Sequence, residues 1–296
     1  MKINFPLLAL AVGAFAIGTT EFSPMGFLPE IANDLSVSIP QAGLLISAYA
    51  VGVMIGAPLM TLWLARFPKK TALILLMAIF TIGNVLATVA PDYMSLMGAR
   101  LITSLNHGAF FGLGSVVAAS VVPKDKQASA VAMIFMGLTI ANIGGVPLAT
   151  WLSQNTSWRM AFAAISILGI MTMLALWKAL SQDHDVVKPN VAKELRVLTR
   201  APVVLALLTT VMSAGAMFAL YTYIAPSLHV FMQASPQTIT LMLVLIGIGF
   251  SIGNHLGGKF ADLSLEKTLI GFLVLLMVMM LVFPVLAQTT VGAAIG

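Results

Sequence analysis

Three titratable side chains lie inside hydrophobic runs of this sequence, where a charge is costly. Glu21 is the only charged residue between Lys2 and Glu30, and Arg100 and His107 share another apolar run. A charged side chain in a membrane-spanning helix costs about 3 kcal/mol or more, so it is usually paired, protonated or directed towards water. Histidine also titrates near neutral pH. These residues are therefore the candidates for proton-binding chemistry.

Glu21 and Arg100 lie at similar predicted depths, which makes an ion pair between them possible. Each is roughly seven residues from the end of its run, and a helix rises about 1.5 Å per residue, so both are about 10 Å deep. His107 follows Arg100 by about two helical turns on the same face. Two interpretations of His107 remain open: a titrating group, or a hydrogen bond to a neighbouring helix.

The composition excludes a soluble protein. Hydrophobic residues make up 59% of the 296 residues and charged residues only 8%, with a mean hydropathy of +1.02, whereas soluble domains carry about 25% charged residues. The apolar runs are long enough for helices that cross a bilayer and lack the alternating pattern of a membrane barrel. We therefore predict an all-α, polytopic membrane protein.

Nine apolar runs are predicted to span the membrane. Their limits are 5–28, 41–64, 71–90, 93–121, 128–152, 158–180, 202–224, 238–257 and 269–286, and 291–296 resembles the start of another. Pro29 is predicted to end the first run, with a loop over 30–40. The polar stretch 181–201 is the predicted cytoplasmic linker between an N-terminal half (1–180) and a partial C-terminal half (202–296).

Basic residues gather at one end of these spans. Of the 15 Lys and Arg residues, 13 fall on one side, and only Arg100 and Arg159 lie in or at the start of spans. Basic loops stay on the cytoplasmic side of inner membranes, so we predict an inner (plasma) membrane protein with a cytoplasmic N-terminus and an uncleaved first span. The same pattern argues against a nucleic-acid partner.

The two predicted halves repeat each other at a fixed spacing of 197 residues. At this spacing the coinciding pairs are Gly18 and Gly215, Pro29 and Pro226, Ser38 and Ser235, Gly52 and Gly249, Gly56 and Gly253, and Lys70 and Lys267. Parallel six-span repeats on either side of a linker characterise a large class of secondary transporters.

Several longer motifs resemble one transporter family. They are GTTEFSPMGFLPEIA at 18–32, LISAYAVGVMIGAPL at 45–59, HGAFFGLG at 107–114, GLTIANIGGVPLATWL at 137–152 and SWRMAF at 157–162. The whole chain resembles the major facilitator superfamily, specifically the arabinose-efflux-permease-like members of its drug/proton antiporter branch. The resemblance implies the major facilitator fold, in which an arginine of span four, here Arg100, is associated with proton coupling.

The resemblance also points to a gating motif in the cytoplasmic loops. The family's loop motif after span two keeps its basic residues as Arg66, Lys69 and Lys70, and its repeat after span eight keeps Gly258 and Asp262. For Asp262 a solvated loop charge is the alternative.

Span five carries an antiporter-like motif of small residues, namely Gly137, Gly144, Gly145 and Pro147. Small residues allow helices to pack closely, and Pro frees a backbone carbonyl. Tight packing and a conformational hinge are both consistent with this motif.

Span seven replaces the charge of span one by aromatic and hydroxyl groups. Phe218 stands at the repeat position of Glu21, and Tyr221 and Thr222 follow it. Such residues are either interfacial anchors or the wall of a substrate cavity. The predicted cavity residues are Phe218, Tyr221, Thr222, Asn106 and Thr103.

These residues and the resemblance together predict a secondary active transporter that carries out proton-coupled efflux of a sugar-like or drug-like small molecule by alternating access. Glu21 is expected to exchange a proton, Arg100 to modulate the pKa of Glu21 and hold its side chain in the cavity, and His107 and Asn106 to contact substrate. The expected partners are the small molecule, protons and the lipid bilayer, and the oligomeric state is open.

The sequence lacks the motifs of enzymes and of metal or cofactor sites. Cysteine is absent, and no nucleophile elbow, phosphate loop or zinc spacing occurs, so no enzyme, cofactor or metal site is predicted. Two alternatives to proton-coupled efflux remain: an uncoupled facilitator of a sugar-like solute, and a truncated, non-functional fragment of such a transporter.

Overall fold

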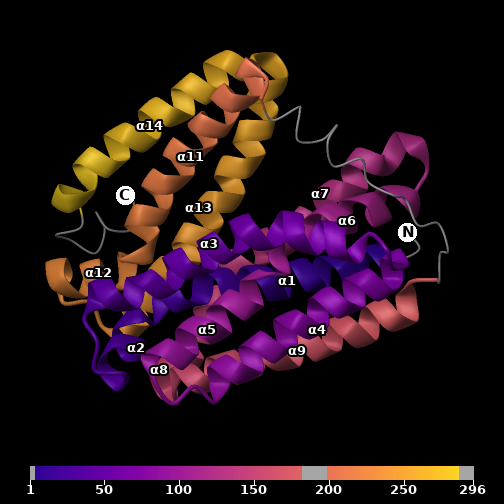
Figure 1. Cartoon of the computed structure of the whole chain (residues 1–296). Helices are drawn as coiled ribbons and strands as arrows, with labels where there is room; N and C mark the ends of the chain where they lie inside the picture. Colours follow the sequence, from indigo (N-terminus) through magenta and orange to yellow (C-terminus); the bar gives the residue numbers. More distant parts are fainter. Residues whose placement is uncertain (1–3, 182–198, 287–296) are drawn as a thin grey trace.

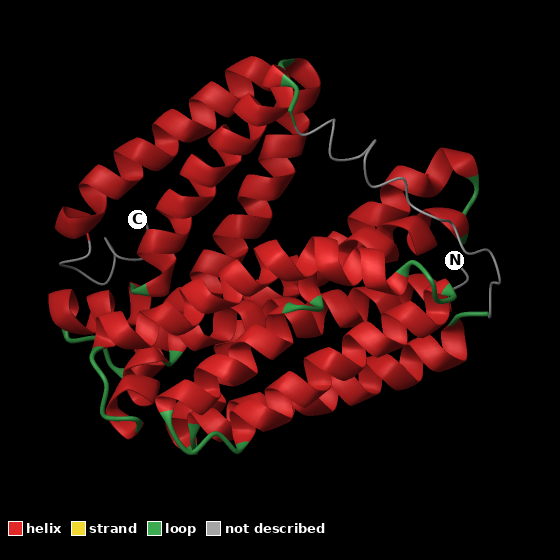
Figure 2. Ribbon diagram, viewed as in Figure 1, coloured by secondary structure: helices red, strands yellow, loops and turns green. Residues whose placement is uncertain are grey.

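The computed structural model describes residues 4–181 and 199–286, which form helices and short loops without any strand (Figure 2). In chain order the elements are α1 (Phe5–Gly26), α2 (Leu28–Asp34), α3 (Ile39–Leu64), α4 (Lys69–Thr88), α5 (Tyr93–Ser104), α6 (His107–Ser120), η1 (Lys124–Lys126), α7 (Gln127–Ile140), η2 (Ala141–Gly145), α8 (Val146–Asn155), α9 (Trp158–Ala179), α11 (Ala201–Thr222), α12 (Ile224–Met232), α13 (Pro236–Leu263) and α14 (Leu265–Leu286). Within the described residues, nine helical segments are long and apolar enough to cross a membrane. The all-α prediction is confirmed.

The first span differs from its predicted limits. It ends at Gly26, and after Phe27 the chain forms the short helix α2. Residues 30–34 of this helix were predicted to belong to a loop. The prediction that Pro29 stops the helix is wrong, because Pro29 occupies the first turn of α2. The first turn of a helix tolerates proline, since its missing N–H would have no helical partner there.

Two other spans are interrupted where the sequence predicted continuous helices. Span four divides into α5 and α6 at Leu105–Asn106. Span five changes from α-helix to a π-helical turn over Ala141–Gly145 before it continues as α8. Such π-helical turns are rare and are frequent at functional sites.

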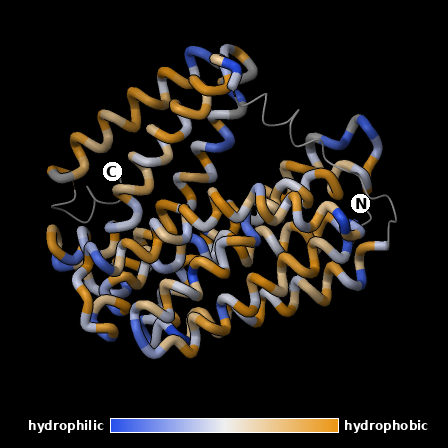
Figure 3. Tube along the Cα trace, in the orientation of Figure 1, coloured by the Kyte–Doolittle hydropathy of each residue, from blue (hydrophilic) through white to orange (hydrophobic). Residues whose placement is uncertain are grey.

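The N-terminal bundle, α1 to α9, has its own hydrophobic core. Its buried residues run from Leu7 to Leu180 and include Leu10, Phe80 and Phe162, all of which are fully covered. Hydrophobic residues follow the helices, and hydrophilic residues gather mostly at helix ends (Figure 3). The bundle therefore holds the titratable residues of spans one and four on a packed frame.

The C-terminal helices meet this bundle at one end only. We call this the outer end: it carries Phe27, Asp92 and Ser157, and the charge pattern predicts that it faces the periplasm. There a second buried cluster joins α1, α2 and α3 to α11, α12 and α13. Towards their inner ends, α11, α13 and α14 lean away from the bundle (Figure 1).

The predicted division into two halves is consistent with these two clusters and stays a prediction. Helix α9 ends at Ala179 and α11 begins at Ala201. Most of the predicted linker, 182–198, lies outside the described residues, as does the predicted start of a further span at 291–296.

Candidate functional site

The centre of the site is a close approach of Glu21 and His107. Glu21 lies on α1, and His107 is the first residue of α6, directly after the break in span four. His107 Nε2 lies 3.8 Å from Glu21 Oε2, and the two side chains are 15% and 18% exposed, respectively. A carboxylate and an imidazole at this distance are one water molecule or a small movement away from a hydrogen bond.

The other nitrogen of the same imidazole contacts Tyr49 of α3. The Tyr49 hydroxyl lies 3.2 Å from His107 Nδ1, and the rings meet edge to face with centroids 5.9 Å apart. Tyr49 is 2% exposed. The hydroxyl therefore has a hydrogen-bonding partner in a place that water barely reaches, and it fixes the orientation of the ring.

Arg100 of α5 lies against the other side of Tyr49. Its guanidinium carbon is 4.2 Å from the centroid of the Tyr49 ring, which is a cation–π contact. Its Nη1 donates a 2.8 Å hydrogen bond to the carbonyl oxygen of Thr20, the residue before Glu21. Arg100 is 1% exposed, and its Nε and Nη2 have no hydrogen-bond partner among the described residues.

The expected ion pair between Arg100 and Glu21 does not form in this conformation. The described residues contain ion pairs of Glu21 with His107 and of Asp34 with Arg159, and none between Arg100 and Glu21. Arg100 reaches the backbone carbonyl of Thr20, the residue before Glu21, instead. Rotation about the helix axis decides which side chain faces the guanidinium, and consecutive residues differ by about 100°.

A second layer of polar groups supports the Thr20 carbonyl. The Thr20 hydroxyl donates a 2.7 Å hydrogen bond to Asn84 Oδ1 of α4, and Asn84 Nδ2 donates to the carbonyl oxygen of Phe80 at 2.9 Å. Thr20 and Asn84 are fully buried. Buried polar groups with partners hold one arrangement, because losing a partner is costly.

Aromatic rings from both parts of the chain meet beside Glu21. Phe22 stacks on Phe218 with centroids 5.8 Å apart and also contacts Tyr221 at 5.8 Å. Tyr221 meets Phe250 edge to face at 5.6 Å, and its hydroxyl donates to Asn142 Oδ1 at 3.4 Å. These contacts bring the two predicted aromatic cavity residues to the junction between the parts.

The remaining predicted cavity residues are covered in this conformation. Thr103 and Asn106 are 1% and 0% exposed inside the N-terminal bundle, and Thr222 is 7% exposed. Thr103 packs on Gly83 of α4. Both amide atoms of Asn106 lack a hydrogen-bond partner among the described residues. A role for these three residues in substrate contact stays a prediction.

The antiporter-like motif of span five lies between α1 and α13. Gly137 and Gly145 pack so closely on α1 that a Cβ atom at either position would overlap it, whereas Gly144 has open space and Pro147 is in the first turn of α8. On its other side, the backbone of the π-helical turn packs against Gly247 of α13. Close packing is therefore observed at two of the glycines, and a hinge role stays a prediction.

The predicted gating residues are spread over the inner end. Arg66 is exposed, donates to the Trp63 carbonyl oxygen at 2.8 Å and covers the Trp63 ring. Lys69 and Lys70 begin α4 and line a small pocket with the ends of α6 and α9. Gly258 and Asp262 lie within α13, which runs to Leu263, so the prediction of a loop at these two positions is wrong. Their gating role stays a prediction.

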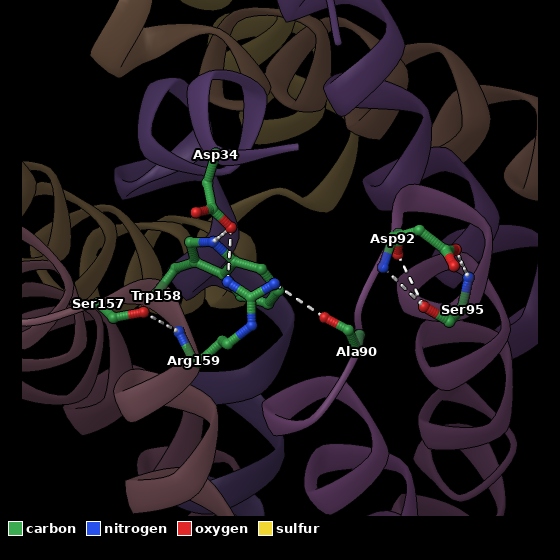
Figure 4. A network of polar contacts seen from close by, with 7 residues as sticks. All are labelled: Asp34, Ala90, Asp92, Ser95, Ser157, Trp158 and Arg159. Atoms are coloured by element: carbon green, nitrogen blue, oxygen red, sulfur yellow. Dashed lines mark hydrogen bonds and ion pairs between the residues drawn. The ribbon is translucent and has the colours of Figure 1, made fainter. Parts of the chain in front are cut away.

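Two groups that the sequence analysis passed over belong to the polar structure. Tyr49 is part of a motif quoted above, but a lone tyrosine in an apolar run gives no sign that it touches both His107 and Arg100. The second group is a tie at the outer end, drawn in Figure 4: Asp34 Oδ2 accepts from Arg159 Nη1 at 2.5 Å and from Trp158 Nε1 at 3.0 Å. No group of three metal-ligating side chains occurs within the described ranges.

Known proteins resemble this chain over most or all of its length. The Escherichia coli inner membrane transport protein YdhP is 66% identical over 296 residues, which is 100% of this chain and 76% of the relative. The putative transporter AraJ of Escherichia coli is 36% identical, with 86% of this chain and 64% of the relative covered. A bacterial homologue of the lysosomal transporter Spinster shares the fold, with a TM-score of 0.75, 19% identity and coverage of 98% of this chain and 70% of that one.

The family model agrees with the fold and with these relatives. The model described as Major Facilitator Superfamily matches residues 10–296, almost the whole chain. Members of this family are transmembrane transporters and not enzymes, and inner-membrane location follows from the 66% identical relative and the membrane spans. This chain belongs to the Major Facilitator Superfamily.

Proposed function

We propose that this transporter exports a small molecule in exchange for protons by alternating access, and that Glu21 carries the proton. The observation that supports this most is the Glu21–His107 approach of 3.8 Å inside two membrane spans. A carboxylate at that depth is costly unless it has a function or a partner. Glu21 has a titratable partner, and both side chains keep some exposure.

The proton affects the conformational equilibrium through the cost of covering a charge. When Glu21 is ionised, closing the inner end around it removes water from a carboxylate, whereas the neutral acid is covered at a much lower cost. A ligand shifts an equilibrium by its difference in affinity for the two states. Proton binding at Glu21 therefore biases the exchange between inward-open and outward-open forms.

The proposed substrate class rests on the aromatic residues where the two parts of the chain meet. Phe22, Phe218 and Tyr221 contact one another here, and separation of the two parts would expose their ring faces and the Tyr221 hydroxyl, which now donates to Asn142. Such a surface suits a ring-bearing or sugar-like molecule, because sugar rings and aromatic molecules both pack against aromatic faces. Both substrate classes are retained in this proposal.

A reporter of conformation tests proton coupling without a known substrate. The chain contains no cysteine, so a single Leu243→Cys substitution gives one labelling site; Leu243 is 0% exposed and packs on Gly26 at the outer end. Because the thiolate is the reacting form, the labelling rate by a membrane-impermeant maleimide is divided by the rate of the unfolded protein at the same pH. We expect this normalised rate to change with pH. With Glu21→Gln added, it should equal the low-pH normalised rate of the parent at every pH.

Glu30→Gln is the matched control, because Glu30 is a partly buried carboxylate outside the predicted spans. It should keep the pH dependence. Unchanged pH dependence in Glu21→Gln would refute Glu21 as the proton carrier. An uncoupled facilitator predicts a normalised labelling rate independent of pH in the parent as well, and accumulation of ethidium or L-arabinose in everted vesicles that a protonophore leaves unchanged.

A further inference from the structure

We propose that Tyr49 and His107 form a relay that reports the protonation of Glu21 by a change of imidazole tautomer. This inference rests on the proposed function, in which Glu21 binds the proton. It adds a positioning residue, Tyr49, and states which nitrogen of His107 carries the hydrogen in each state.

The geometry places one partner at each ring nitrogen. Nε2 faces the Glu21 carboxylate at 3.8 Å, and Nδ1 faces the Tyr49 hydroxyl at 3.2 Å. A neutral imidazole carries one N–H and one acceptor nitrogen, so its two partners cannot both be donors or both be acceptors. The role of Glu21 therefore determines the role of Tyr49.

With Glu21 ionised, the carboxylate only accepts. The hydrogen of His107 is then on Nε2 and points to Glu21, and Nδ1 accepts from the Tyr49 hydroxyl. With Glu21 protonated, the carboxylic acid donates to Nε2, the ring carries its hydrogen on Nδ1, and the Tyr49 oxygen accepts. Glu21, His107 and Tyr49 together gain one proton, and the imidazole stays neutral in both states.

Tyr49 passes this change to Arg100. The guanidinium carbon of Arg100 lies 4.2 Å from the Tyr49 ring centroid, and its Nη1 holds the carbonyl oxygen of Thr20, one residue before Glu21. A hydroxyl that donates leaves the ring richer in electrons than one that accepts, so the cation–π attraction is stronger when Glu21 is ionised. The relay thus connects the carboxylate to Arg100 without a direct ion pair.

Few other charged groups can act on this imidazole. Helix α6 packs against α1, α3, α4 and α7. Glu21 of α1 and Tyr49 of α3 are the groups described above, α7 has no titratable residue, and α4 carries only Lys69 and Lys70, at its inner end. Arg100 precedes His107 along span four, on α5.

Nitrogen-15 NMR of histidine-labelled protein tests the relay directly. The chain has four histidines, and His107→Gln identifies the signal of His107 by its loss. We expect the Nε2–H tautomer at high pH and the Nδ1–H tautomer once Glu21 is protonated. In Glu21→Gln this change with pH should disappear, and in Tyr49→Phe the Nδ1–H tautomer should be less populated once Glu21 is protonated, because Nδ1–H then lacks its acceptor.

Phe111→Leu is the control, since Phe111 contacts the ring at 5.2 Å without a polar atom; it should leave the tautomers unchanged. One tautomer at every pH in the parent, or a doubly protonated ring beside an ionised Glu21, would overturn the relay. If Tyr49→Phe does not fold, the pH dependence of the His107 tautomer in the parent and in Glu21→Gln still tests the relay. A pH-dependent Leu243→Cys reporter with an unchanging tautomer would reject the relay and leave the proposed function standing.

Discussion

At the scale of single residues, Arg100 is held by a hydrogen bond and a contact with an aromatic ring, without an ion pair to Glu21. Its fixed contacts are the Thr20 carbonyl oxygen at 2.8 Å and the face of Tyr49. A planar guanidinium can donate in its plane and stack at the same time, which an ammonium cannot do. Arginine at this position therefore does more than supply a positive charge.

A double-mutant cycle measures the contact between Arg100 and Tyr49. We expect Arg100→Met and Tyr49→Leu to show a coupling free energy of about 1–2 kcal/mol in thermal or denaturant unfolding, because the pair is desolvated. Arg66 and Trp63 are the matched control: they make the same type of contact at 5.7 Å and are exposed. Their cycle should give about 0.5 kcal/mol. Equal coupling in both cycles would contradict this account.

At the scale of elements, the tie at the outer end fixes α2 to the N-terminal bundle. Arg159, in the first turn of α9, donates to Asp34 at the end of α2 and, through Nη2, to the carbonyl oxygen of Ala90 at 2.8 Å (Figure 4). Three segments that are distant in sequence are joined by one guanidinium. Because α2 also packs on α12 of the C-terminal part, the tie determines which part α2 follows when the two separate.

The tie also has a pH dependence with a defined sign. The hydrogen bond from Arg159 is the main cause that holds the pKa of Asp34 below its ordinary value. A lowered carboxyl pKa stabilises the folded state above the ordinary value of about 3.9, and this stabilisation is lost as the pH falls through the lowered pKa. The Asp34 side chain is 47% exposed, so we expect about 1 kcal/mol or less.

Melting temperatures at neutral and acidic pH measure this contribution. Asp34→Asn should lower the melting temperature near neutral pH by a few degrees and reduce the loss on acidification. Arg159→Gln should have a similar effect, and the double variant should be no worse than the more harmful single one. Asp92→Asn is the control, because Asp92 caps α5 through Ser95 and is independent of the tie. Fully additive losses from Asp34 and Arg159 would refute the tie.

At the scale of the whole molecule, the two parts close against each other at the outer end. Gly247 of α13 lies on the backbone of Asn142 and Ile143 so closely that a side chain there would overlap main-chain atoms. Thr240, two turns earlier on α13, donates to Gln154 Oε1 at 3.1 Å. This interface has to separate before the outer end can open.

A larger residue at Gly247 should therefore favour the outward-open form. Overpacking a tight interface costs about 1–3 kcal/mol, which is roughly a fivefold to 150-fold shift in population. We expect Gly247→Leu to raise the labelling rate of Leu243→Cys by a factor in that range. Gly249→Leu is the matched control on the same helix, because nothing lies within 4 Å of a Cβ at Gly249. Equal rates in the two variants would show that this interface does not close the outer end.

The sequence alone determined the spans, and it predicted the orientation and the candidate residues for proton binding. Hydrophobic runs and basic loops report the cost of moving polar groups into lipid, a property of local composition. They identified Glu21, Arg100 and His107 without any structure, and resemblance over the whole chain added the family. The predicted limits of most spans lie close to the observed helix ends, because the helices end where the polar and charged loops begin.

Only the tertiary structure decided which of these side chains meet. Rotation of each helix is set by packing against several neighbours at once, so Glu21 faces His107 while Arg100 reaches the Thr20 carbonyl oxygen. Tyr49 became part of the site for the same reason. The break in span four and the π-helical turn in span five were also beyond the sequence, because contacts with other helices, such as Gly247 against Asn142, surround them. The position of a residue along its span can be predicted from its own run of sequence, but its contacts depend on how several helices pack together.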